Sequence, residues 1–197
     1  KNPLTPMRLG IQHLRRVHRE RPELLGAALD ETAERILAEI ERLDTIARAF
    51  SRFAAPTGPT VAPDQMRLAP VANEVVQLYR LAGAGTDVVL ESDPAAWGSA
   101  RPDEVKEVLV NLLENARQAG ANHIVVKVLP NRLEIHDDGQ GISAELLPRI
   151  FEPRFSTTTS GSGLGLAIVR RLVEGWGGTV QVESEDGRGT VVTVELV

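Results

Sequence analysis

Apolar side chains recur at intervals of three and four along the first part of the chain, which is the spacing of one face of an α-helix. In one segment the repeat is carried by Leu4, Met7, Ile11, Leu14 and His18, and in a second by Leu29, Ala33, Ile36, Ile40, Leu43, Ala47, Phe50 and Ala54. Residues 19–26 contain Pro22 and Gly26 and interrupt the repeat, which predicts a connecting loop. Residues 1–54 are therefore predicted to form a helical hairpin with a heptad-like seam.

Two amphipathic helices bury such a seam poorly by themselves. One solution is a homodimer in which two hairpins form a four-helix bundle. The alternative is an intramolecular hairpin that packs on the rest of the chain, and the pattern alone does not separate the two. His18 falls on the predicted seam and His13 off it, and both are interpreted as packing or surface residues.

Residues 55–63 are rich in Pro, Gly and Thr, which is typical of a semi-stiff linker. Beyond it, helix and strand patterns mix. Helices are predicted over 70–81, 102–119, 144–149 and 163–176, and strands over 87–91, 124–129, 132–136, 179–184 and 190–197. No parallel β-α-β repeat is evident. We therefore predict an α+β chain in which residues 64–197 form an α/β sandwich, with helices on one face of a mixed sheet.

Composition narrows the class of protein. The chain has 197 residues, of which 42% are hydrophobic and 25% charged, as expected for one large or two small globular domains. The formal net charge of −5 argues against a nucleic-acid partner, and the absence of cysteine excludes disulfides and thiolate metal sites. No apolar run is long enough to cross a bilayer and no signal peptide is visible. The chain starts within a predicted helix, so we expect a fragment of a longer protein.

Three separated segments carry candidate chemistry. Asp137 ends a predicted strand and precedes Gly139 and Gly141, so its carboxylate can accept a hydrogen bond from an exocyclic amine such as that of adenine. The glycine-rich segment 161–165 leads into a predicted helix, whose free N–H groups attract phosphate. A third feature is a polar helix face formed by Glu107, Asn111 and Asn115.

Carboxamide oxygens on that face suit a hard cation such as Mg²⁺. Each feature alone is more often a plain turn, a flexible loop or a solvated face. Neither a phosphate-binding loop of the Gly-x-x-x-x-Gly-Lys type nor the dinucleotide spacing is present. The order and the spacing of these three features along the chain together predict a nucleotide site.

The set resembles the catalytic and ATP-binding domain of sensor histidine kinases, within the class that includes gyrase and the chaperone ATPases. Four segments resemble the N box, the first glycine box, the F box and the second glycine box: 108–116, 137–141, 150–155 and 161–166. Residues 1–6, Lys-Asn-Pro-Leu-Thr-Pro, resemble the tail of a phosphoacceptor box in the style of nitrogen-regulation sensors.

The resemblance implies roles for individual residues. Asp137 would read adenine, Asn111 would bind Mg²⁺, and Asn115 would hold the phosphates or the ion. The other residues implied in ATP binding are Gly139, Gly141, Arg154, Thr158, Gly161, Ser162, Gly163, Leu164, Gly165 and Leu166. Thr158 stands where related sensors often carry a lysine, which leaves the γ-phosphate to Mg²⁺ and Arg154. Residues 157–162 are interpreted as a lid over the phosphates, or else as a plain surface loop.

Two residues are implied in catalysis. Glu107 would orient or deprotonate an acceptor histidine, and Asn2 would position water for dephosphorylation of the partner. His123 and His136 are interpreted as structural. The accepting histidine of the family precedes the segment that resembles residues 1–6, so the printed sequence lacks it.

The resemblance therefore predicts the kinase core of a two-component sensor. It would use ATP and Mg²⁺ and pass phosphate through a histidine to an aspartate of a response-regulator receiver domain. It would be cytoplasmic as a fragment, with the parent protein anchored in the inner membrane only through other parts. The alternative is a nucleotide-gated binding module that does not phosphorylate itself. A clamp or chaperone ATPase is disfavoured by the short length and by the hairpin.

Overall fold

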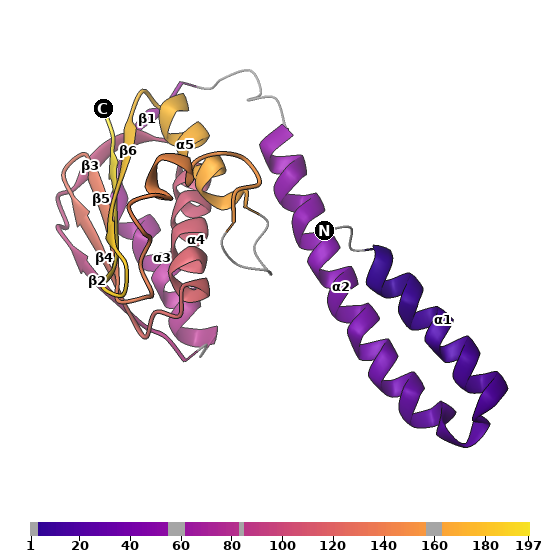
Figure 1. Ribbon diagram of the computed structural model, residues 1–197. Helices are drawn as coiled ribbons and strands as arrows, with labels where there is room; N and C mark the ends of the chain where they lie inside the picture. The colour runs from indigo at the N-terminus through magenta and orange to yellow at the C-terminus, as the bar shows by residue number, and fades with distance from the viewer. Residues whose placement is uncertain (1–3, 55–61, 83–84, 157–162) are drawn as a thin grey trace. The chain divides into compact units, whose positions relative to one another are not determined.

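The N-terminal helices form a hairpin. The computed structural model describes residues 4–54, 62–82, 85–156 and 163–197 (Figure 1). Helix α1 (Leu4–Glu20) is followed by a 3-10 turn (Pro22–Leu24) and by α2 (Leu25–Ala54). The chain divides into two units, residues 1–54 and 55–197, which are described separately.

The two helices touch along a narrower stripe than the sequence predicts. Gly10 lies against Thr32, which is only 6% exposed, and a Cβ on Gly10 would be 2.8 Å from the Thr32 methyl group. Val17 is half-buried, whereas His18 is exposed, so the placement of His18 on the seam is wrong for the hairpin itself. Ile11 is 53% exposed for the same reason: one neighbouring helix covers only half of a heptad face.

The second unit is built on a five-stranded mixed sheet. Its strands are β2 (Asp87–Ser92), β4 (His123–Leu129), β5 (Arg132–Asp137), β6 (Thr179–Glu185) and β7 (Gly189–Glu195), in the order β2-β4-β5-β7-β6. All neighbours are antiparallel except β2 and β4. The chain passes through α4 (Pro102–Gln118) between these two parallel strands, so one β-α-β crossover is present that the sequence did not reveal.

Helices α3 (Leu68–Ala82), α4 and α5 (Gly165–Gly175) cover one face of this sheet (Figure 1). Buried and more exposed side chains alternate along β4: Ile124, Val126 and Val128 are buried beneath the helices, and their neighbours in sequence are more exposed. This arrangement confirms the predicted α+β class with helices on one face of a mixed sheet.

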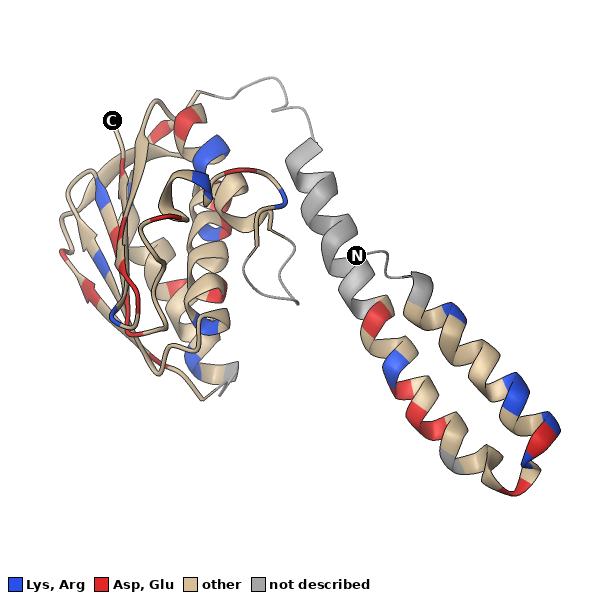
Figure 2. Ribbon diagram, viewed as in Figure 1, with Lys and Arg blue, Asp and Glu red and all other residues tan. Residues whose placement is uncertain are grey.

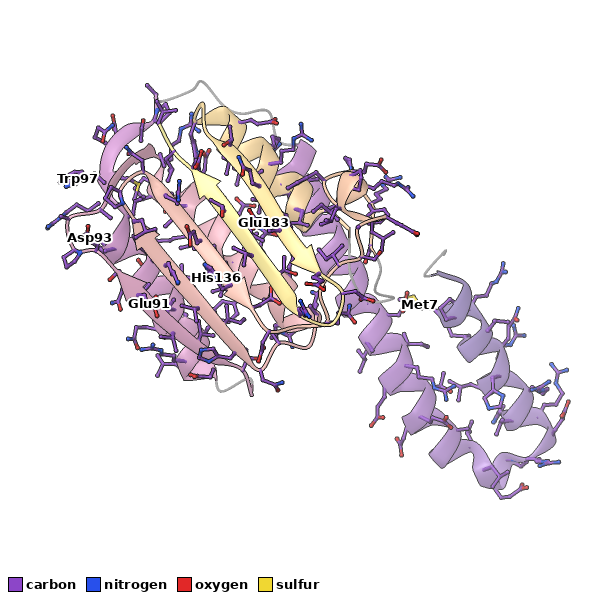
Figure 3. The ribbon with its side chains drawn as sticks, turned by 60° about the vertical axis from the view of Figure 1, so that its left-hand side comes forward. Met7, Glu91, Asp93, Trp97, His136 and Glu183 are labelled. Atoms are coloured by element: carbon purple, nitrogen blue, oxygen red, sulfur yellow. The ribbon has the colours of Figure 1, made fainter. Side chains whose placement is uncertain are left out.

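The other face of the sheet is polar (Figure 3). Glu134 lies 2.9 Å from His136 and 3.5 Å from Arg132, and Arg132 in turn lies 2.9 Å from Glu195. The hydrogen bond from His136 is the main cause of the lowered pKa of Glu134. Glu134 is paired with His136 and Arg132 along β5, and Arg132 is paired with Glu195 across to β7, so these polar side chains find partners on the solvated face.

A second, two-stranded sheet was not predicted. Strand β1 (Asp64–Arg67) pairs antiparallel with β3 (Trp97–Ala100). Both strands are four residues long, and β3 contains Gly98, whose missing side chain makes room for Leu68 and Leu196. Such short strands show too little alternation to be recognised from sequence. Within the described ranges, no helix is both long and apolar enough to cross a bilayer.

Two glycines in the β6–β7 turn provide a matched test of backbone packing. Gly187 and Gly189 both have positive φ, at 75° and 91°. A Cβ on Gly187 would meet nothing within 4 Å, whereas one on Gly189 would lie 2.0 Å from the carbonyl oxygen of Asp137. We expect Gly187→Ala to lower the free energy of unfolding by about 1 kcal/mol, the cost of the left-handed conformation.

Gly189→Ala must in addition displace the backbone at Asp137, so we expect a loss of about 3 kcal/mol or more. Urea unfolding of both variants measures the difference. Equal losses would mean that the turn does not pack on β5 as described.

Candidate nucleotide site

The polar face of α4 presents two carboxamides, and a hydrogen bond fixes the orientation of the first. The Asn111 Nδ2 group donates to the backbone carbonyl of Glu107 at 2.8 Å, so Asn111 Oδ1 is the atom turned away from its own helix. Asn115 Nδ2 is buried and has no hydrogen-bond partner among the described residues. The face therefore offers one free carbonyl oxygen and one buried donor, which suits a cation next to an anion.

The start of α5 lies directly against these two side chains. A Cβ built on Gly165 would be 3.3 Å from both Asn111 Oδ1 and Asn115 Oδ1. Gly165 is the first residue of α5, where backbone N–H groups lack partners within the helix. The structure thus brings the predicted metal face and the predicted phosphate turn together, with no side chain between them.

Asp137 ends β5 and is half-buried, as predicted. Its Oδ1 accepts the N–H of Gly139 at 2.9 Å. Burial raises the pKa of the Asp137 carboxyl, and the hydrogen bonds from the backbone of Gly139 and Thr190 only partly oppose this. Thr190 is opposite Asp137 in the β5–β7 register and is buried, which no sequence motif indicated.

The glycines of the 137–141 segment approach the chain's own backbone. A Cβ on Gly139 would be 2.9 Å from the Ala119 Cβ at the end of α4, and one on Gly141 would be 2.0 Å from the Glu185 carbonyl oxygen. Gly141 also has a φ of 70°, which only glycine adopts without strain. The segment is therefore held between the end of α4 and the β6–β7 turn, and this fixes the position of Asp137.

The 150–155 segment meets the glycine-rich segment at Gly163. The Arg154 N–H donates to the Gly163 carbonyl at 2.8 Å, and a Cβ on Gly163 would be 2.6 Å from the Arg154 carbonyl carbon. Arg154 has a φ of 68°, a conformation that costs a non-glycine residue energy. The Arg149 and Arg170 guanidinium groups lie over the rings of Phe155 and Phe151.

Several predicted residues lie outside the described ranges or have little contact with the site. Asn2, Thr158, Gly161 and Ser162 are outside the described ranges. Leu164 is 3% exposed, so its side chain belongs to the core, and Leu166 is half-buried. The Arg154 side chain is exposed. Their binding roles stay predictions.

The donor set fits Mg²⁺ only together with phosphate. In the described part of the chain, no three histidine, cysteine or acidic residues are grouped to hold a metal. Asn111 Oδ1 is a single neutral oxygen ligand, and Mg²⁺ is ordinarily bound by a few protein groups together with substrate phosphates and water. An ion here would neutralise phosphate charge, and Asn111 would be its protein ligand.

Comparison with known proteins identifies the family to which this fold is similar. Residues 100–197 match the family of histidine kinase-, DNA gyrase B- and HSP90-like ATPases. Over its full length the chain is 32% identical to the sensor histidine kinase ZraS of Escherichia coli (strain K12) and 29% identical to the nitrogen regulation protein NtrY of Azorhizobium caulinodans. It spans 43% and 27% of these two proteins, less than half of either.

Solved structures of histidine kinases are also similar to this chain. The catalytic domain of histidine kinase ThkA matches 69% of the chain, and 95% of that structure, with a TM-score of 0.59 and 28% identity. ThkA in complex with the response regulator TrrA matches 99% of the chain, and 57% of that structure, with a TM-score of 0.72 and 25% identity. The chain belongs to the sensor histidine kinases of two-component systems, within this ATPase superfamily.

Gly165→Ala tests whether the space next to the two asparagines is used by a ligand. The added methyl group suits helical backbone, and its 3.3 Å contacts require the two asparagine side chains to shift by only a few tenths of an ångström, so the melting temperature should change little. It occupies the space where phosphate would approach, and we expect about tenfold weaker binding of an ATP analogue by calorimetry. Gly175→Ala is the matched control on the same helix, because a Cβ there meets nothing within 4 Å. Equal affinities for both variants would place the ligand elsewhere.

Asp137→Asn should separate stability from binding. Because the folded pKa is raised, the native state holds the proton more tightly than the unfolded state. The stability contributed by Asp137 therefore falls as pH rises from its ordinary pKa of 3.8 through the folded value. The asparagine variant lacks this loss, so at neutral pH it should melt no lower than wild type.

Without the charged acceptor, adenine nucleotide affinity should fall about ten- to a hundredfold. A variant that melts lower but binds normally would contradict both roles.

Proposed function

We propose that the chain is the kinase core of a two-component sensor, which binds ATP with Mg²⁺ and transfers the γ-phosphoryl group to a histidine. The proposal rests chiefly on one observation: Gly165 at the start of α5 lies against Asn111 Oδ1 and Asn115 Oδ1. Phosphoryl transfer depends on positioning and charge neutralisation more than on covalent chemistry by the enzyme. The two asparagines and the start of α5 supply both the positioning and the charge neutralisation.

Each residue has a defined task in this proposal. Asp137 accepts a hydrogen bond from the adenine amine, and Asn111 holds the ion. Asn115 donates to a phosphate oxygen through its buried Nδ2 group. Glu107 lies on the same face of α4, where it orients or deprotonates the acceptor imidazole.

The phosphate would pass to an aspartate of a receiver domain, because ThkA is known in complex with a response regulator. Asn2 would position water for the reverse, dephosphorylating activity. Arg154 would assist Mg²⁺ at the γ-phosphate. Membrane attachment, if any, would come from parts of the protein beyond this sequence.

The decisive experiment incubates [γ-³²P]ATP with a version of the protein extended upstream of Lys1, and then adds a receiver domain. Acid-labile, base-stable label on the kinase, transferred to the receiver, is expected. Nucleotide binding without any label would favour the alternative of a nucleotide-gated binding module. Absence of nucleotide binding would refute both.

We further propose that the hairpin forms the homodimer. Among the hairpin residues whose burial is described, the exposed large apolar side chains are Leu9, Ile11, Leu24, Leu29, Leu37 and Ile40. Lys and Arg gather on α1, and Asp and Glu predominate on the described part of α2 (Figure 2). Two copies could therefore bury the exposed apolar residues and pair opposite charges, as a four-helix bundle does.

Leu37→Glu tests the dimer. Leu37 is 59% exposed in the single chain, so a charge there costs little in a monomer but is buried at a bundle interface. We expect light scattering to show a dimer for wild type and a monomer for Leu37→Glu at micromolar concentration. Leu81→Glu is the control, because Leu81 is 83% exposed on the other unit. Two dimeric variants would exclude the hairpin face around Leu37 as the interface.

A further inference from the structure

Helices α4 and α5 touch at two places that lie far apart along both. At one end Gly165 meets Asn111 and Asn115. At the other end the Trp176 indole N–H donates to Glu104 Oε2 at 2.5 Å. Residue order shows that the helices run antiparallel, because the start of α5 meets the later half of α4 and its end meets the first turn.

The second contact is charged and directional. Trp176 directly follows α5 and is 3% exposed. Its acceptor Glu104 is also held by Arg101, whose Nη1 group donates to Oε1 at 2.9 Å and to Oε2 at 2.7 Å. The Arg101 and Glu104 side chains are only 20% and 25% exposed. Charge-assisted hydrogen bonds that water reaches poorly are strong and geometrically demanding.

The contact lies on the nucleotide-binding face of α4. Glu104 precedes Glu107 by three residues and Asn111 by seven, the spacing of one helix face. Residues 104 and 115 are eleven positions apart, and so are residues 165 and 176. Both spans correspond to about 16 Å along a helix. The two contacts therefore define the same length on each helix, which sets one register.

The other buried residues on the two helices make no directional contact. Those of α4 are Val105, Val108, Leu109, Leu112, Leu113 and Ala116, and those of α5 are Ala167, Ile168, Val169, Leu172 and Val173. All are aliphatic, and aliphatic burial is not directional. A slip of one residue would move the start of α5 by about 1.5 Å. Ligand geometry in functional sites tolerates only about 0.5 Å.

We propose that Trp176 and Glu104 form a register latch, a pair of positioning residues that sets the distance between the start of α5 and the Asn111–Asn115 pair. The latch rests on the proposed nucleotide site and deepens it. It acts on nucleotide affinity from the far end of the helix pair, without touching the ligand. Arg101 holds the Glu104 carboxylate in place for it.

The two tryptophans of the chain allow a direct spectroscopic test. In Trp97→Phe the only tryptophan is Trp176, and in Trp176→Phe it is Trp97, which lies on β3 of the two-stranded sheet and is 47% exposed. Titration with the Mg²⁺ complex of a non-hydrolysable ATP analogue should change the fluorescence of the first variant and leave that of the second unchanged.

Affinity measurements complete the test. We expect Trp176→Phe to bind the analogue about fivefold more weakly or worse, the lower end of measured couplings between separate sites. Glu104→Gln keeps an acceptor oxygen for the indole and should recover most of the affinity that Glu104→Ala loses. Val128→Ala, a buried site on β4, is the stability control and should lower the melting temperature without weakening binding.

The outcomes separate the latch from the nucleotide site. If wild type binds and Trp176→Phe binds equally well despite a lower melting temperature, the pair is merely structural and the latch is refuted. An unchanged Trp176 fluorescence in the titration would also refute the latch. If wild type itself does not bind the analogue, the proposed function fails first.

Discussion

The close approach of α5 to α4 at Gly165 is the constraint on which the rest of the site depends. Any side chain at this position would fill the space in front of Asn111 and Asn115. The bare start of a helix, a free carbonyl oxygen and a buried amide donor can share this space because nothing else occupies it. The distance between Gly165 and the two asparagine side chains therefore links the fold to the chemistry of the site.

The proposed adenine end of the site is built in a different way. Asp137 is placed by glycines that pack backbone against backbone, with Gly141 against Glu185 and Gly189 against Asp137 itself. This packing keeps a carboxylate half-buried, and its raised pKa shows the cost of burying the charge. Carboxyl groups with perturbed pKa values cluster at functional sites, which supports the proposal that Asp137 meets a ligand.

The sequence was most informative where periodicity is long or a motif is dense. The five strands of the larger sheet were predicted, although 87–91 alternates only weakly, and the Glu107–Asn111–Asn115 face follows from helical spacing alone. Contacts between distant segments were not accessible. Thr190 reaches Asp137 through strand register, and Trp176 reaches Glu104 through helix packing. In the described part of the hairpin the predicted seam residues Ile11, Leu29 and Ile40 are exposed, because spacing shows which residues are apolar but not how many helices cover them.

The most direct test of this account is a crystal structure with Mg²⁺ and a non-hydrolysable ATP analogue. The account predicts the adenine amine within hydrogen-bond distance of the Asp137 carboxylate, and Mg²⁺ about 2.1 Å from Asn111 Oδ1. A phosphate oxygen should accept from Asn115 Nδ2. A nucleotide bound elsewhere, or an ion held by other side chains while Asn111 faces solvent, would contradict it.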